Sequence, residues 1–239
     1  MSMRNFSLAL SGGLMLALPV AVRAQHHDVS PYSMGGRVYT NGATHDGTVY
    51  PGERVFGYDF GELPAGVNEA LDPGFFFPES YETDFNSTDM PNGLSFAFNV
   101  LSPLQVWNGS SFDVVSNGDF INLETGLDGP VSVTGVSGFQ AGFNVLTFLR
   151  DGNDEDAHIS STLFDSTVSP PVPTGVYLVE LQITAPGRIA SDPIFVVYNY
   201  GETEVVHDEA IEFVQSAIPE PASLGLLAMA LPFVGRRRR

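Results

Sequence analysis

Short apolar runs separated by turn-forming residues dominate the chain between residues 25 and 217. Eleven such runs are rich in β-branched and aromatic side chains, and glycine, proline, asparagine and aspartate lie between them. The runs cover residues 37–40, 54–60, 94–101, 104–107, 112–115, 120–123, 131–136, 143–149, 158–164, 175–184 and 193–200. This pattern predicts an all-β domain, a single β-sandwich of short antiparallel strands.

Two segments depart from the strand pattern. Residues 61–85 have no clear period and are predicted to form a long loop, held by the aromatic residues 75–77 and Tyr81. Residues 205–217 repeat apolar side chains at helical spacing and carry acidic residues near their start. They predict one helix at the C-terminal end of the domain.

Charge and cysteine content exclude several classes of protein. The chain has 28 acidic and 10 basic residues and a net charge of −18, so it is an acidic protein. Every basic residue is an arginine, and only four of them lie between residues 25 and 217. Nucleic-acid binding needs clustered basic side chains, so it is not expected. With no cysteine, the chain has no disulfides, no thiol nucleophile and no cysteine-ligated metal.

The N-terminal residues have the organisation of a secretory signal peptide. Arg4 precedes the almost wholly apolar residues 6–22, and small residues occupy the third and first positions before the predicted cut. Cleavage is expected between Ala24 and Gln25. Residues 1–24 are therefore predicted to direct export, and residues 25–217 to form the folded domain.

Residues 218–239 combine a proline-rich motif, an apolar run and a terminal basic cluster. The motif is Pro219, Glu220 and Pro221, and the basic cluster is Arg236, Arg237, Arg238 and Arg239. A helix over residues 222–235 would span about 21 Å, less than the roughly 30 Å hydrocarbon core of a bilayer. It is expected to be a marginal transmembrane anchor, with the arginines on the cytoplasmic side.

The order of these features resembles the PEP-CTERM sorting signal of Gram-negative bacteria. The resemblance implies an exosortase-type processing enzyme as a partner and transient anchoring in the inner membrane. It further implies delivery to the cell surface or the extracellular matrix, where exopolysaccharide is a candidate partner. It assigns no activity to the folded domain.

Histidine next to aspartate is the clearest chemical pattern of the domain. The chain has five histidines, and each lies within two residues of an aspartate. The candidate ligands among them are His27, His45, His158 and His207. Neutral imidazole together with carboxylate suits zinc or manganese. The hypothesis is a divalent metal site formed by His27, Asp28 and His158, joined by His45. The alternative is a set of ordinary surface histidines, and His207 is the weakest candidate because Glu204 is its only ligand neighbour on a helix.

A second resemblance involves the same histidines. His27, Asp28 and Val29 open the domain, and His158 precedes a Gly-Val-Tyr-Leu sequence at residues 175–178. This arrangement resembles surface domains of the choice-of-anchor M type, which implies a link to metal uptake. Ser160 stands where those domains often have a second histidine.

Three further hypotheses remain open. The acidic run at residues 151–156 offers Asp151, Asn153 and Asp156 as calcium ligands, although a solvated hairpin tip explains the same residues. Trp107 and neighbouring aromatic residues suggest a carbohydrate-binding platform, for which Phe112, Tyr198 and Tyr200 are the other candidates. A carbohydrate-active enzyme would need two facing carboxylates about 5 to 9.5 Å apart.

Known catalytic sequence patterns are missing from the chain. It has no nucleophile elbow, no zinc-protease helix motif, no phosphate-binding loop and no dinucleotide fingerprint. The expectation is therefore a non-catalytic structural or binding module, exported and displayed outside the inner membrane.

Replacing Ala24 tests the export prediction. Ala24→Phe places a bulky side chain immediately before the cut, so the exported chain should keep its N-terminal segment. The unchanged chain, and a Gln25→Ala control altered on the other side of the bond, should be cut there. Mass spectrometry of protein exported by a Gram-negative host measures both, and an unprocessed native chain would contradict the prediction.

Overall fold

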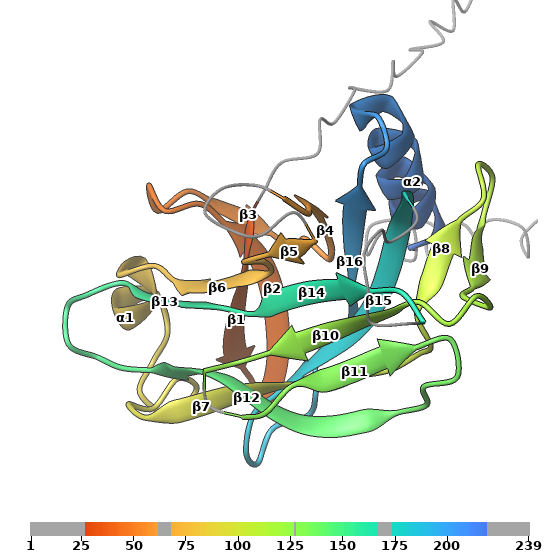
Figure 1. Cartoon of the computed structure of the whole chain (residues 1–239). Coiled ribbons are helices and arrows are strands. Elements are labelled where there is room, and N and C mark those ends of the chain that lie inside the picture. Colours follow the sequence, from red (N-terminus) through yellow and green to blue (C-terminus); the bar gives the residue numbers. More distant parts are fainter. Residues whose placement is uncertain (1–26, 62–67, 127, 167–173, 219–239) are drawn as a thin grey trace, which may run out of the picture.

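The computed structural model describes residues 27–61, 68–126, 128–166 and 174–218 (Figure 1). In these ranges the chain consists mostly of β-strands, with two short helices, α1 (Ser80–Asp84) and α2 (Glu204–Ala217). The strands are β1 (Asp28–Met34), β2 (Arg37–Ala43), β3 (Val49–Pro51), β4 (Val55–Asp59), β5 (Glu69–Ala70), β6 (Gly74–Phe77), β7 (Leu94–Val100), β8 (Gln105–Trp107), β9 (Phe112–Val114), β10 (Phe120–Glu124), β11 (Val131–Thr134), β12 (Gln140–Phe148), β13 (Glu155–His158), β14 (Ser160–Phe164), β15 (Gly175–Thr184) and β16 (Pro193–Tyr200). The predicted signal peptide with its Ala24–Gln25 bond, and the sorting segment from residue 219 onward, lie outside the described residues.

The strands form three sheets that share a main apolar core. A five-stranded sheet has the order β13-β6-β1-β2-β3, and a four-stranded sheet has the order β11-β10-β14-β5. The seven-stranded sheet runs β12-β7-β15-β16-β4, with β8 and β9 attached through β15. Side chains from all three sheets meet in the same core, among them Phe75, Phe98 and Ile121.

The expectation of antiparallel strands with a single helix needs two corrections. Most pairs are antiparallel, but β1 pairs with β6 and β16 pairs with β4 in parallel. Parallel neighbours need long connections, and both pairs join segments that are distant in the sequence. The second correction is helix α1, which lies in the segment expected to be a loop.

The prediction of a loop over residues 61–85 was wrong for β5, β6 and α1, which all lie in this segment. In β6, the side chains of Phe75, Phe76 and Phe77 are at most 1% exposed. The strand lies between β1 and β13 and is buried along its whole length. A fully buried strand reads as a continuous apolar run without alternation, so periodicity does not reveal it.

The predicted strand over residues 158–164 is two strands that belong to different sheets. β13 pairs with β6 in the five-stranded sheet, whereas β14 pairs with β10 and β5 in the four-stranded sheet. Between them, the backbone N–H of Ile159 donates to the carbonyl oxygen of Pro73 at 3.1 Å. The change of sheet leaves His158 as the last residue of β13.

The predicted helix at the C-terminal end is confirmed as α2. Ala210, Ile211 and Val214 are buried against apolar side chains of the seven-stranded sheet, including Val55 and Val197. α2 therefore covers β4, β15 and β16, next to which it is drawn in Figure 1. Within the described ranges, neither helix is long and apolar enough to cross a bilayer.

Gly135 lies where the four-stranded and seven-stranded sheets approach each other closely. The N–H of Leu104, just before β8, donates to the carbonyl of Thr134 at 2.9 Å, and a Cβ at Gly135 would overlap the backbone carbonyl oxygen of Val115. Gly135→Ala should lower the free energy of unfolding by about 1–3 kcal/mol, because the backbone must shift to relieve the overlap.

Gly138→Ala is the matched control for denaturant unfolding. A Cβ at Gly138 meets nothing within 4 Å, and neither glycine has a positive φ. Equal stability of the two variants would contradict the close approach between the sheets.

Candidate metal centre

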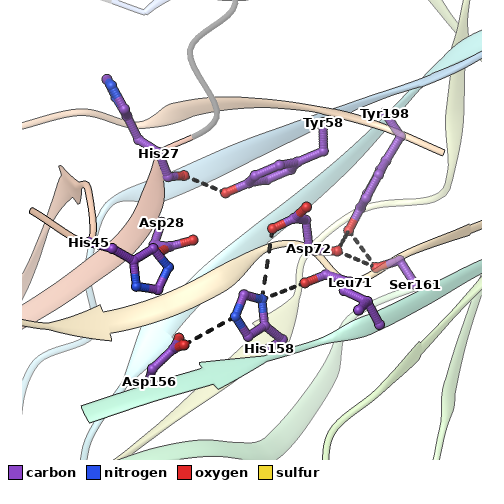
Figure 2. Close-up of polar contacts among 10 residues, drawn as sticks. All are labelled: His27, Asp28, His45, Tyr58, Leu71, Asp72, Asp156, His158, Ser161 and Tyr198. Carbon is purple, nitrogen blue, oxygen red and sulfur yellow. Dashed lines mark hydrogen bonds and ion pairs between the residues drawn. The ribbon is translucent and has the colours of Figure 1, made fainter. Parts of the chain in front are cut away.

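Four polar side chains meet at one end of the five-stranded sheet. Asp28 begins β1, His45 lies in the turn after β2, and Asp156 and His158 belong to β13. We call these residues the histidine–aspartate cluster. Figure 2 shows them close together, with Asp72 nearby.

Strand geometry and a glycine bring β13 and β1 together at this point. Asp156 and His158 are two residues apart on a strand, so their side chains share one face. His158 is paired with Gly74 on β6. A Cβ at Gly74 would overlap the carboxylate of Asp28 and lie 3.2 Å from Cε1 of His158. Because Gly74 has no side chain, the carboxylate of Asp28 reaches across β6 toward His158.

A tight turn presents His45 to the same place. The carboxylate of Asp46 accepts hydrogen bonds from the hydroxyl of Thr44 at 2.6 Å and the backbone N–H of Thr48 at 3.0 Å. These bonds lower the pKa of Asp46 to about 2. Nε2 of His45 lies 3.0 Å from Oδ2 of Asp28, and its ring is stacked at 6.5 Å from that of His158.

The hydrogen bonds of His158 fix which ring nitrogen is available. Nδ1 lies 2.6 Å from the backbone carbonyl oxygen of Leu71, and a carbonyl only accepts, so Nδ1 carries the proton. In the neutral ring, Nε2 then has a free lone pair, and it lies 3.3 Å from Oδ2 of Asp156. Two acceptors face each other there, which favours a proton or a metal ion between them.

Negative charge concentrates around His158. Burial lowers the pKa of His158, but the Asp156 carboxylate, the Leu71 carbonyl, Asp28 and Asp72 outweigh it and raise the pKa. Burial raises the pKa of Asp28 to about 6, although His45 and His158 act in the opposite direction. The surroundings therefore favour a cation at this end of the sheet.

His27 lies apart from the cluster, although the sequence hypothesis included it. Its ring stacks on Tyr50 at 3.8 Å, and its Nδ1 lies 2.8 Å from Oε2 of Glu53. Figure 2 shows this ring directed away from the other histidines, while the His27 carbonyl accepts a 2.6 Å hydrogen bond from Tyr58. Neighbours on an extended chain point to opposite sides, so Asp28 enters the cluster and His27 does not.

Two of the three proposed calcium ligands, Asp151 and Asn153, are hydrogen-bonded to each other. Asp151 accepts hydrogen bonds at 3.1 and 3.0 Å from the backbone and side-chain N–H groups of Asn153, which forms a local turn. Asp156 instead lies with His158 and His45. Among the described residues, the close groups of histidine and carboxylate ligands include Asp156 but not Asp151.

The aromatic residues suggested for carbohydrate binding do not share one surface. Tyr198 is fully buried, and Trp107 packs against Phe112 and Phe213 at 5.1 and 5.2 Å. A pocket of about 250 Å³ lies between this region and α2. Its lining contains no carboxylate and consists of Gln105, Ser111, Phe112, Leu178, Phe195, Phe213, Val214, Ala217 and Ile218.

Asp156 was named as a calcium ligand in the acidic run and not as a ligand of the histidine site. Its position two residues before His158 is the sequence signal for a shared strand face. Gly74 was missed because it lay within the predicted loop. Gly74 matters because β1 and β13 flank it, and the sequence alone does not reveal these neighbours.

Comparison with known proteins assigns no family. No protein-family model matches the chain, and no curated protein matches it. The resemblances to the PEP-CTERM signal and to choice-of-anchor M domains therefore remain predictions from short motifs.

Proposed function

We propose that the chain is an exported, non-catalytic surface module that binds a divalent transition-metal ion at the histidine–aspartate cluster. The observation that carries this proposal is the convergence of His45, Asp156 and His158. Their ligand atoms lie within 4.8 Å of one another, although more than a hundred residues separate His45 from β13.

The ligand set favours zinc or manganese over calcium. Imidazole nitrogen suits zinc and other transition metals, whereas calcium takes oxygen ligands. His45, His158 and Asp156 supply two nitrogens and one oxygen, and Asp28 is the fourth ligand. A nitrogen–oxygen separation of 3.0 Å between His45 and Asp28, and of 3.3 Å between His158 and Asp156, is compatible with two ligands on one ion.

The backbone orients the His158 ligand before any ion arrives. A metal-binding histidine usually donates its other ring N–H to a carbonyl or carboxylate, which fixes the tautomer and the ring orientation. At His158, the backbone carbonyl of Leu71 is the group that accepts this hydrogen bond. The ion would replace the proton that otherwise separates Nε2 from Asp156.

Export and display give the proposed module its location. The signal-peptide pattern supports export. The PEP-CTERM-like segment supports a transient hold in the inner membrane and cutting by an exosortase-type enzyme. Retention at the cell surface or in the extracellular matrix follows, where the domain, a β-sandwich in this proposal, presents its metal site. The missing catalytic motifs support a binding role rather than an enzymatic one.

Replacing His158 tests the metal proposal. Zinc or manganese in hundredfold excess over its dissociation constant should stabilise the native chain by about 2.7 kcal/mol. His158→Ala should lose one bound ion per chain and most of that ion's stabilisation, because it removes a ligand held by Leu71. Elemental analysis and thermal melting with and without chelator measure both effects.

His27→Gln is the matched control. His27 precedes Asp28 directly, but its ring bonds to Glu53 away from the cluster. This variant should keep the full metal content. The proposal is wrong if His158→Ala retains the ion content of the native chain.

A further inference from the structure

His207 is a completely buried histidine that the proposed metal centre does not use. It lies on α2, and its side chain is 0% exposed. The ring lies against β4 at Gly57, where a Cβ would come within 3.4 Å of Cε1 and Nε2 and within 2.5 Å of Cδ1 of Ile211. Gly57 therefore allows α2 and its histidine to approach the strand closely.

One ring nitrogen of His207 forms a hydrogen bond with the backbone. Nε2 lies 3.0 Å from the carbonyl oxygen of Val197 on β16. Because a carbonyl only accepts, Nε2 carries the proton, and the neutral ring has its lone pair on Nδ1. Nδ1 is buried without a hydrogen-bond partner. A buried polar atom in this state calls for an explanation.

Two carboxylates lie beside the unpartnered nitrogen. Asp59 ends β4 and Glu204 begins α2, and one ligand atom from each lies within 4.8 Å of His207 and of the other carboxylate. Glu204 is exposed, so its side chain is free to adjust, whereas His207 is fixed by packing.

The spacing between His207 and Asp59 fits shared ligation better than a hydrogen bond. Nδ1 lies 3.7 Å from Oδ1 of Asp59, which is too long for a hydrogen bond. Two ligands on a tetrahedral ion with bonds of about 2.0–2.1 Å are about 3.4 Å apart. Asn199 donates to the same Oδ1 at 2.7 Å and so orients this carboxylate.

We infer that Asp59, Glu204 and His207 form a second site for a divalent transition-metal ion, separate from the histidine–aspartate cluster. One imidazole nitrogen and two carboxylate oxygens suit zinc or manganese, and water completes the coordination. The ion joins the start of α2 to the end of β4, the last strand on one side of the seven-stranded sheet. Metal occupancy would therefore control how firmly α2 is held on that sheet.

Zinc binding to the full chain in a His158→Ala background tests this site alone. That background removes the first site, so calorimetry and elemental analysis should find one remaining zinc ion per chain. Adding Glu204→Gln should weaken its binding by at least about tenfold, and Asp59→Asn should do the same. Glu209→Gln, an exposed acidic residue on the same helix, is the control and should leave the affinity unchanged.

The outcomes separate the two sites. A native chain that binds one zinc ion, lost on Glu204→Gln but kept on His158→Ala, would support the second site and contradict the first. A His158→Ala chain that binds no zinc would overturn the second site. Circular dichroism of each variant checks that the fold is retained.

The protonation of His207 gives an independent readout. Two-bond ¹H–¹⁵N spectra of the metal-free chain at neutral pH should show a proton on Nε2 alone, and zinc should shift the Nδ1 resonance. Protons on both nitrogens that persist when zinc is added would overturn the inference, because His207 would then be an imidazolium paired with Asp59.

Discussion

The burial of β6 is the constraint on which the proposed metal centre depends. Phe75, Phe76 and Phe77 are almost completely buried, and each such side chain contributes about 1.5–3 kcal/mol when removed from water. Their packing fixes the register of β6 against β1 on one side and β13 on the other. That register places Gly74 between Asp28 and His158. A shift by one residue would put a phenylalanine side chain where the two polar groups meet.

Backbone carbonyls perform the same task at both proposed sites. Leu71 accepts from Nδ1 of His158, and Val197 accepts from Nε2 of His207, so the opposite ring nitrogen is left available in each case. His27 differs, because its Nδ1 lies against Glu53 and its ring against Tyr50. The distinction between a ligand histidine and a packed histidine therefore depends on what each ring nitrogen faces.

The sequence predicted those parts of the fold in which the spacing of apolar side chains matches the side of the strand or helix that is buried. Alternating and apolar runs revealed most strands, and helical spacing revealed α2. It did not reveal β6, because burial on both faces removes alternation, and it joined β13 to β14, because the change of sheet at Ile159 depends on distant partners. For the same reason, His45 and His158 were recognised by residue type, whereas Gly74 and the approach of Asp59 to His207 appear only when the strands are assembled.

Anomalous diffraction at the zinc absorption edge from crystals of the zinc-loaded chain tests the central claim most directly. Metal binding at the histidine–aspartate cluster predicts a peak about 2.0–2.1 Å from Nε2 of His158 and from a ring nitrogen of His45. The Asp156 carboxylate should lie at a similar distance. A fully loaded crystal with no zinc at this cluster, or with its zinc at His27 instead, would contradict the account.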